Sequence, residues 1–353
     1  MTTPELEESL RKLTFSPDLK TLLVQRLWGN IPSHVEPTPL EPYFEYYSTR
    51  CKEFLCDGGS NVSIKTHADS LRIANLILQD EDKDSIIHNL AEGSASTLRQ
   101  RKLDEASIHL VAGLLTMAEV GVLESGATGR RPLKWTGGSL RSLLAAEFAP
   151  QKEMDASAAK IEKRFIANNI SKIAGIELKW TSNLADHLLL HGDDKSVYIF
   201  HHAEFHKFQS LAAVSFWPDG LLDETLRTLA LLFPQNDRGT RRLLAGIKGI
   251  DQTVGCCGVS RAQDRRFEKF SVWHDRLVIL KQAFDDSRPQ TISQWWWDRR
   301  NGVQWYTFWV AIMVFILTVF FGTVQSIEGA LQVYLSYKSL QGDDGTGLHV
   351  RSP

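Results

Sequence analysis

The chain has 353 residues, of which 43% are hydrophobic and 23% are charged, and its formal net charge at pH 7 is −2. This apolar content can fill the core of one large domain or two small ones, which excludes a disordered tether. A nearly neutral chain has no overall attraction to nucleic acid, so we expect no nucleic-acid partner. The four cysteines lack the C-x-x-C spacing of a metal or redox motif and suit a reducing compartment.

Residues 1–45 open with a charged segment and contain prolines at positions 32, 37, 39 and 42. Proline removes a backbone donor and favours turns, so this spacing predicts a loosely ordered N-terminal lead. Residues 46–290 then have the density of apolar positions that is typical of a packed, mainly helical region.

The clearest helix of this region is predicted from Asp104 up to Gly121, which would terminate it. Its apolar residues recur at helical spacing, namely Ile108, Val111, Leu114, Leu115 and Ala118. Ser139 is a favourable N-cap for a short helix that ends near Phe148. A further helix is expected over residues 161–173.

Residues 176–180 change to period-two alternation, as in a half-buried strand. Residues 188–200 follow as a small β-hairpin around the turn Gly192-Asp193-Asp194. With a short strand at 133–135, residues 104–200 have the element order of a winged-helix-like subdomain, so the predicted fold class is mainly α with a small β part (α+β). The acidic turn would repel DNA phosphate, which argues against DNA binding.

Three helices are predicted after the hairpin. The first begins at Pro218 and is ended by Pro234, the second covers residues 239–247, and the third is a long amphipathic helix over residues 263–284. The first has an apolar stripe, and the third would pack on the core or on a partner.

The densest group of potential metal ligands lies around the hairpin, and its candidates are His187, His191, His202 and His206. Two pairs have i,i+4 spacing, which places both imidazoles on one face of a helix. The segment lacks H-E-x-x-H, in which a glutamate activates metal-bound water, and neither a phosphate loop nor a G-x-S-x-G elbow is present. We therefore expect no catalytic residue, no metal and no cofactor, and histidines bonded to backbone are the simpler interpretation.

Residues 305–325 form a predicted transmembrane helix, because no charge occurs between Arg300 and Glu328. About 20 helical residues cross a hydrocarbon core of about 30 Å. Residues 291–304 are rich in tryptophan and are expected to form a helix at the membrane interface. The span itself contains Trp305, Trp309, Phe315, Phe320 and Gly322.

Positive charges flank the span unequally, since Arg288, Arg299 and Arg300 precede it and only Lys338 follows closely. This bias predicts a cytosolic N-terminal region and a single-pass, tail-anchored topology. The first residues have neither a basic start nor an apolar run, so no signal peptide is predicted.

Residues 326–353 are expected to form an amphipathic exit and a polar tail. Gly322, Ser326 and Ala330 recur every four residues, a small-xxx-small pattern that lets two helices approach closely in lipid. Homo-oligomerisation is one hypothesis; the other is that small residues are common in membrane helices. The expected partners are thus the lipid bilayer, other proteins and further copies of the chain.

The C-terminal sequence shows a family resemblance. The stretches WHDRLVILKQAF, SQWWWDRRNGVQWYTFWVA and QSIEGALQVY, with IAGIELKWTSNLADHLLL and VYIFHHAEF upstream, resemble a group of single-span membrane proteins of filamentous fungi. The likeness covers most of the chain from about residue 100. It implies a fungal origin and a membrane location, and it carries over no catalytic residue.

These features favour a non-enzymatic membrane protein whose cytosolic region is a protein-interaction or scaffolding module. Two alternatives stay open. One is a membrane-tethered enzyme or metal-binding protein that uses the histidines of residues 187–206. The other is an accessory subunit of a transporter, since a single span without ionisable residues offers no polar path of its own.

Overall fold

The computed structural model describes residues 4–12, 14–29, 40–91, 97–121, 132–150, 154, 160–212, 216–287 and 302–343. The chain divides into two compact units, Met1–Arg288 and Pro289–Pro353, which are described separately. In agreement with the predicted fold class, the described residues are mainly helical, with a small three-stranded sheet and one long apolar helix near the C-terminus.

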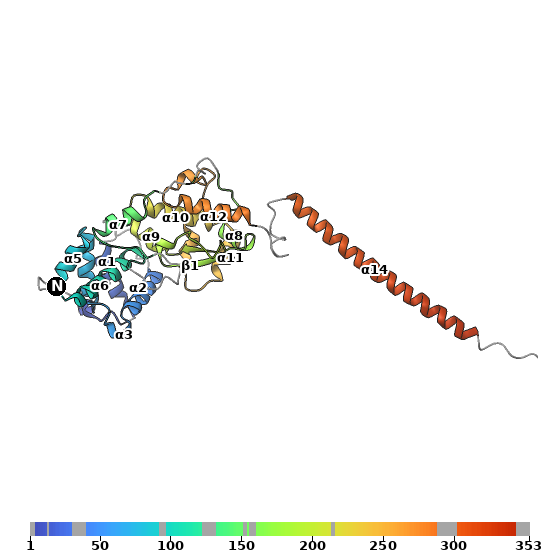
Figure 1. The fold of residues 1–353 in the computed structure, drawn as a ribbon, viewed down its shortest axis with the longest axis horizontal. Helices are drawn as coiled ribbons and strands as arrows, with labels where there is room; N and C mark the ends of the chain where they lie inside the picture. The colour runs from blue at the N-terminus through green and yellow to red at the C-terminus, as the bar shows by residue number, and fades with distance from the viewer. Residues whose placement is uncertain are drawn as a thin grey trace, which may run out of the picture. The chain divides into compact units, whose positions relative to one another are not determined.

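The first part of unit 1 is a group of helices, drawn from blue to green in Figure 1. Its central helix is α6 (Leu98–Thr116), which packs against α2, α4 and α5. Two tyrosines of α2 donate to carbonyls of α6, Tyr43 to Leu114 and Tyr46 to Gly113, both at 3.0 Å. Besides α6, this part contains η1 (Pro4–Glu7), α1 (Pro17–Trp28), α2 (Glu41–Phe54), α3 (Cys56–Gly59), α4 (His67–Leu78), α5 (Lys83–Leu90) and α7 (Leu140–Glu147).

The structure differs from the prediction of a loosely ordered lead over residues 1–45. Ser16 caps α1 by accepting from the backbone N–H of Leu19 at 3.1 Å. The apolar face of α1 is buried in the core, and the Trp28 ring lies 5.7 Å from that of Phe205. Pro42 sits in the first turn of α2, where the missing N–H needs no partner. The other three prolines lie outside the described residues.

The second part of unit 1 contains the sheet. Strands β1 (Glu177–Thr181) and β3 (Ser196–Phe200) pair in parallel, and β2 (Leu190–His191) pairs with β3 in antiparallel register. The predicted strand and hairpin are therefore confirmed, and the hairpin turn has positive φ at Gly192, Asp193 and Asp194. The winged-helix arrangement is not confirmed, because β1 lies parallel to β3 and Leu133 bridges Val120 instead of joining this sheet.

Helices cover this sheet, and Figure 1 shows them in green to orange. They are α8 (Ala167–Lys172), α9 (Ala203–Leu211), α10 (Leu221–Leu232), α11 (Arg238–Ala245) and α12 (His274–Asp286), together with the short turns η3 (Leu184–Asp186), η4 (Gln252–Cys256) and η5 (Phe267–Lys269). The helix predicted over 161–173 is shorter than expected, since only α8 is regular. The helices predicted after Pro218 and near residue 239 are confirmed as α10 and α11.

The long helix predicted from residue 263 begins only at His274, and a buried carboxylate of α10 explains this. Glu224 is 2% exposed and accepts from the backbone N–H groups of Ser271, Val272 and Trp273 at 2.7–2.8 Å. Trp273 is the N-cap residue of α12, and Ser271 and Val272 lie just before it, so Glu224 fixes the N-terminal end of α12 from another element. The Ser271 hydroxyl donates to the same carboxylate at 2.8 Å.

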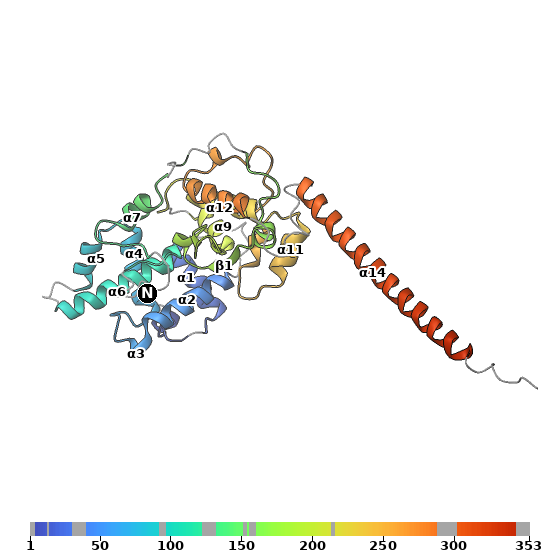
Figure 2. The same ribbon diagram turned by 45° about the vertical axis from the view of Figure 1, so that its right-hand side comes forward.

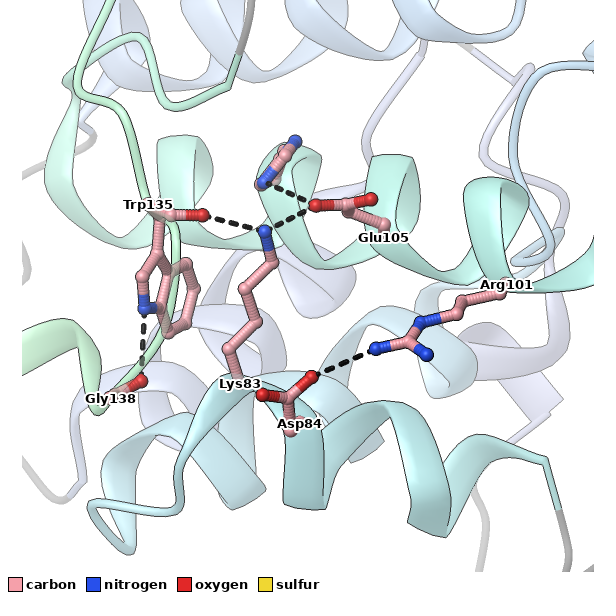
Figure 3. A network of polar contacts seen from close by, with 7 residues as sticks. Lys83, Asp84, Arg101, Glu105, Trp135 and Gly138 are labelled. Atoms are coloured by element: carbon pink, nitrogen blue, oxygen red, sulfur yellow. Dashed lines mark hydrogen bonds and ion pairs between the residues drawn. The ribbon is translucent and has the colours of Figure 1, made fainter. Parts of the chain in front are cut away.

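A buried lysine joins three segments of the helical part (Figure 3). Lys83 is 4% exposed, and its Nζ donates to the Glu105 carboxylate of α6 and, at 2.6 Å, to the carbonyl of Trp135. The Trp135 indole N–H and the Lys83 backbone N–H both donate to the Gly138 carbonyl at 3.0 Å. This network fixes the segment before α7 onto α5 and α6.

Unit 2 contains one long helix, α14 (Gly302–Asp343), which Figures 1 and 2 draw as unbroken. By length and composition it is able to cross a membrane over part of Trp305–Ser339. The prediction of a long apolar helix at 305–325 is therefore confirmed, and the helix continues beyond it. Of the predicted interfacial helix, residues 291–301 lie outside the described residues, whereas 302–304 belong to α14.

Candidate functional site

The structure places the four candidate histidines in different settings. His191 is exposed at the end of β2, whereas His187, His202 and His206 are buried. Burial lowers the pKa of His206 to about 3 and holds the pKa values of His187 and His202 well below their usual range. All three imidazoles are therefore neutral at pH 7.

His187 has a structural role in the core. Its Nδ1 accepts from the backbone N–H of Phe200 at 3.2 Å, which assigns the ring proton to Nε2. Nε2 then donates to the Thr228 hydroxyl at 2.7 Å, and this hydroxyl donates to the Thr225 carbonyl at 2.6 Å. Arg276 donates to the His187 carbonyl at 2.6 Å. These bonds connect β3, α10 and α12, as expected for a histidine bonded to backbone.

No metal centre emerges from these side chains. Within the part of the chain that the structure describes, no group of three or more His, Cys, Asp or Glu residues is arranged to hold a metal ion. His202 precedes α9 and His206 lies on it, whereas His187 is bonded to Thr228 and Phe200 and His191 is exposed.

Among the described residues of unit 1, a polar cavity of about 290 Å³ lies beside α2 and is called the α2 cavity below. Its walls are α2, Glu119, residues 180–183, residues 201–202 and Gly249. Strands β1 and β3 end at the paired residues Thr181 and Phe200, and the residues just after each strand line the cavity. The cavity thus lies at the carboxyl ends of parallel strands, where α/β proteins bind their ligands.

The α2 cavity combines charged and neutral polar side chains. Arg50 is 13% exposed at its side chain, and its Nη1 donates to Glu53 at 2.6 Å. Glu45 and Glu119 add two further carboxylates to the wall. His201 is neutral at pH 7, because burial lowers its pKa to about 4 although Asp251 acts in the opposite direction.

Within the described residues, three side chains of the same wall have a buried atom without a hydrogen-bond partner. They are Arg50 at Nε, Asn183 at Nδ2 and His202 at Nδ1, and the latter two residues are 3% and 2% exposed. The other polar atoms of Asn183 and His202 are used, since Asn183 Oδ1 accepts from the Glu119 N–H at 2.9 Å and His202 Nε2 bonds to the Ser182 hydroxyl at 2.8 Å. Buried polar groups without partners are uncommon, and they occur where a ligand or water completes the site.

Sequence reasoning did not identify the α2 cavity, although it selected His202. The available signal was the spacing of Glu45, Thr49 and Glu53 along α2, which gives one polar helix face. That this face lies against the ends of β1 and β3 follows only from the fold.

The predicted span residues lie on α14. Phe315 and Phe320 are 68% and 59% exposed, and the ring centroids of Trp305 and Trp309 are 6.2 Å apart. Gly322 has no atom within 4 Å of the position that a Cβ would take, so this face of α14 is open.

Comparison with known proteins gives no relative for this chain. No protein-family model, no curated protein and no solved structure matches it.

Proposed function

We propose that the chain is a single-pass, tail-anchored membrane protein whose first unit lies on the cytosolic side and serves as a protein-interaction module. The observation that carries this proposal is α14, which by length and composition is able to cross a membrane.

The exposed apolar surface of α14 is too large to be stable in water. Nine large apolar side chains between Val310 and Phe321 are about half exposed or more. Burying each contributes about 1.5–3 kcal/mol, so together they represent on the order of 20 kcal/mol, compared with about 5–15 kcal/mol for the stability of a whole domain. A hydrocarbon layer about 30 Å thick matches the length of the segment Trp305–Val324.

The hydroxyl groups of α14 also suit a hydrocarbon environment. Thr307, Thr318 and Thr323 each donate to the carbonyl four residues earlier, at 2.8 Å. A hydroxyl bonded within its own helix needs no water, which is the condition for a polar group inside lipid. This supports the proposed span independently of its apolar residues.

Native cysteines offer a test of the proposed topology. Cys56 and Cys256 are exposed on unit 1, and Ser339→Cys would add a reporter near the other end of α14. In microsomes with the cytosolic face outward, we expect a membrane-impermeant maleimide to modify Cys56 and Cys256 directly and the Ser339→Cys reporter only after detergent is added. The reverse pattern would place unit 1 on the opposite side.

Beyond the proposed span, α14 has the properties of a helix that associates with other helices. Its 42 residues extend over about 63 Å, roughly twice the hydrocarbon thickness. Because the helix is unbroken, its apolar residues outside the bilayer cannot lie flat on the membrane surface. Ile327, Leu331 and Leu335 are each more than half exposed there, so a protein partner is the cover that fits.

Two faces of α14 are available for such contacts. Successive helical residues turn by about 100°, so the small-residue face (Gly322, Ser326 and Ala330) and the apolar stripe (Ile327, Leu331 and Leu335) lie well apart around the helix. We propose that the small-residue face pairs two copies of the chain and that the apolar stripe contacts a further protein.

Variants of the small-residue face and variants of the apolar stripe serve as controls for each other. We expect Gly322→Leu with Ser326→Leu to abolish crosslinking between copies in the membrane, because bulky side chains separate the backbones. Leu331→Ala with Leu335→Ala should leave that crosslinking intact and reduce the set of proteins found by proximity labelling in cells. Unchanged crosslinking in the first variant would exclude pairing through the small-residue face.

A further inference from the structure

We infer that the α2 cavity binds a basic amino acid, either free or as a side chain of a partner protein. The ligand has a guanidinium or ammonium group together with an oxygen that accepts hydrogen bonds. This inference concerns unit 1 alone, so it stands or fails independently of the proposed membrane anchor.

The charge of the cavity wall selects a cation. Three carboxylates line it, those of Glu45, Glu53 and Glu119, against a single guanidinium from Arg50 among the described lining residues. His201 and His202 contribute no positive charge at pH 7, because burial keeps both rings neutral. A cationic group entering this cavity gains favourable charge interactions, whereas a free anion would face the excess of carboxylates.

The unpartnered polar atoms indicate that the ligand has more than a charge. Asn183 Nδ2 is a donor in a side chain that is 3% exposed, and it has no acceptor within the described structure. An acceptor oxygen of the ligand would satisfy it, and a buried donor gains most from being satisfied. The carboxylate of a free amino acid, or the carbonyl of a peptide, supplies this oxygen beside the cationic side chain.

The size and walls of the cavity suit the same ligand. A volume of about 290 Å³ lies at the lower end of small-molecule pockets, which usually have about 300–1,000 Å³. Trp180 and Tyr46 add aromatic rings to the walls, and a guanidinium or ammonium group binds favourably against such rings. The parallel strands β1 and β3 hold residues 182–183 and 201–202 on a rigid base, so the site is largely formed before binding.

Isothermal titration calorimetry of the full-length chain in detergent micelles at pH 7.5 would test this inference. The probes are L-arginine and L-citrulline, which have nearly the same shape but differ in charge, with L-glutamate as an acidic control. We expect arginine to bind at least tenfold more tightly than citrulline and glutamate to show no binding. Equal binding of arginine and citrulline would overturn the inference, and so would the absence of binding at 10 mM by arginine, L-lysine and the arginine peptide described below.

Substitutions in the cavity wall test whether arginine binds in the α2 cavity. Glu45→Gln with Glu119→Gln should weaken arginine binding at least tenfold and reduce its preference over citrulline to within about twofold. Glu147→Gln removes an exposed carboxylate of α7 outside the cavity and should bind arginine like the parent chain. If the cavity variant shows the same urea unfolding curve as the parent and still binds arginine equally well, the site lies elsewhere and the inference is wrong.

A peptide arm distinguishes the two sources of the ligand. A pentapeptide with one central arginine, blocked at both ends, is titrated beside free arginine. Tighter binding of the peptide supports a partner's side chain as the occupant, and tighter binding of free arginine supports a metabolite. Failure of both probes would overturn the inference.

Discussion

In unit 1, Phe165, Phe200 and Leu277 have essentially no exposed surface, whereas on α14 Phe315 and Phe320 are 68% and 59% exposed. The same kinds of side chain are thus hidden in one unit and displayed in the other. Unit 1 also buries charged groups such as Glu224 and Lys83 and gives each several partners, while the proposed span contains no charge. The difference teaches that unit 1 buries its apolar side chains within its own fold, whereas α14 displays them along a helix that is able to cross a membrane.

The largest expected effect comes from charging the span. Phe315→Lys with Phe320→Lys should move the full-length chain from the membrane pellet to the supernatant after alkaline extraction, or lead to its degradation. Each lysine near the centre of a span disfavours insertion by about 3 kcal/mol, so two disfavour it by about 6 kcal/mol. Gln332→Lys, beyond the span, is the matched control and should remain in the pellet. If the unchanged parent chain were found in the supernatant, α14 would not be a membrane span, and the contrast between unit 1 and α14 would be refuted.

The buried histidines of unit 1 should make its stability sensitive to acid. Burial lowers the pKa values of His67 and His201 to about 4 and that of His206 to about 3. The unfolded chain takes up these protons near pH 6.5 and the folded chain does not, so stability is lost as pH falls from about 6.5 towards the folded pKa values. Over 2.5 pH units this amounts to roughly 3 kcal/mol for each buried histidine.

Urea unfolding followed by tryptophan fluorescence at pH 7 and pH 4.5 would measure this loss. His206→Leu should reduce the difference in unfolding free energy between pH 7 and pH 4.5, because this variant lacks one buried ring that takes up a proton only when the chain unfolds. The control His191→Asn changes an exposed ring and should leave the difference as it is. Equal pH dependence of the parent and His206→Leu would contradict the lowered pKa of His206.

Glu224→Gln should destabilise unit 1 by about 3 kcal/mol, because an amide replaces one acceptor oxygen with a donor opposite buried N–H groups. The carboxylate accepts from three backbone N–H groups and the Ser271 hydroxyl, so no rotation of the glutamine satisfies all of them. Urea unfolding at pH 7 measures the change, with Glu147→Gln expected to stay within about 0.5 kcal/mol of the parent. A loss below 1 kcal/mol would show that the start of α12 does not depend on this carboxylate.

Local signals in the sequence were sufficient for several elements of the fold. The apolar spacing before Gly121 predicted α6, Ser139 predicted the start of α7, and the turn at 192–194 predicted the hairpin. Each of these elements depends on residues that are close in the chain. The start of α12 could not be found in this way, because Glu224, which fixes it, lies 47 residues before Ser271. The parallel pairing of β1 with β3 is likewise a matter of tertiary packing.

The candidate site was less accessible to sequence reasoning than the fold. The density of histidines in the sequence did not identify a metal site, because His187 is buried and bonded to Thr228 and Phe200 while His191 is exposed. The α2 cavity depends on α2 meeting the ends of two strands more than 120 residues later in the chain. No spacing rule connects such segments, whereas the apolar run of α14 is contiguous and was therefore recognised directly.

The smallest effect tests how unit 1 tolerates a buried charge. Lys83→Met should destabilise the unit by about 2 kcal/mol, because the Trp135 carbonyl loses its charged donor while the Glu105 side chain, 41% exposed, is still solvated by water.

The Lys83 hydrogen bond also lowers the pKa of Glu105, so the stabilisation is present above about pH 4.3 and is lost as pH falls through the folded pKa. Arg101→Met removes the neighbouring, exposed pair with Asp84 and should change stability by less than 0.5 kcal/mol. Urea unfolding compares the two variants, and equal effects would mean that burial of Lys83 contributes nothing beyond an ordinary surface ion pair.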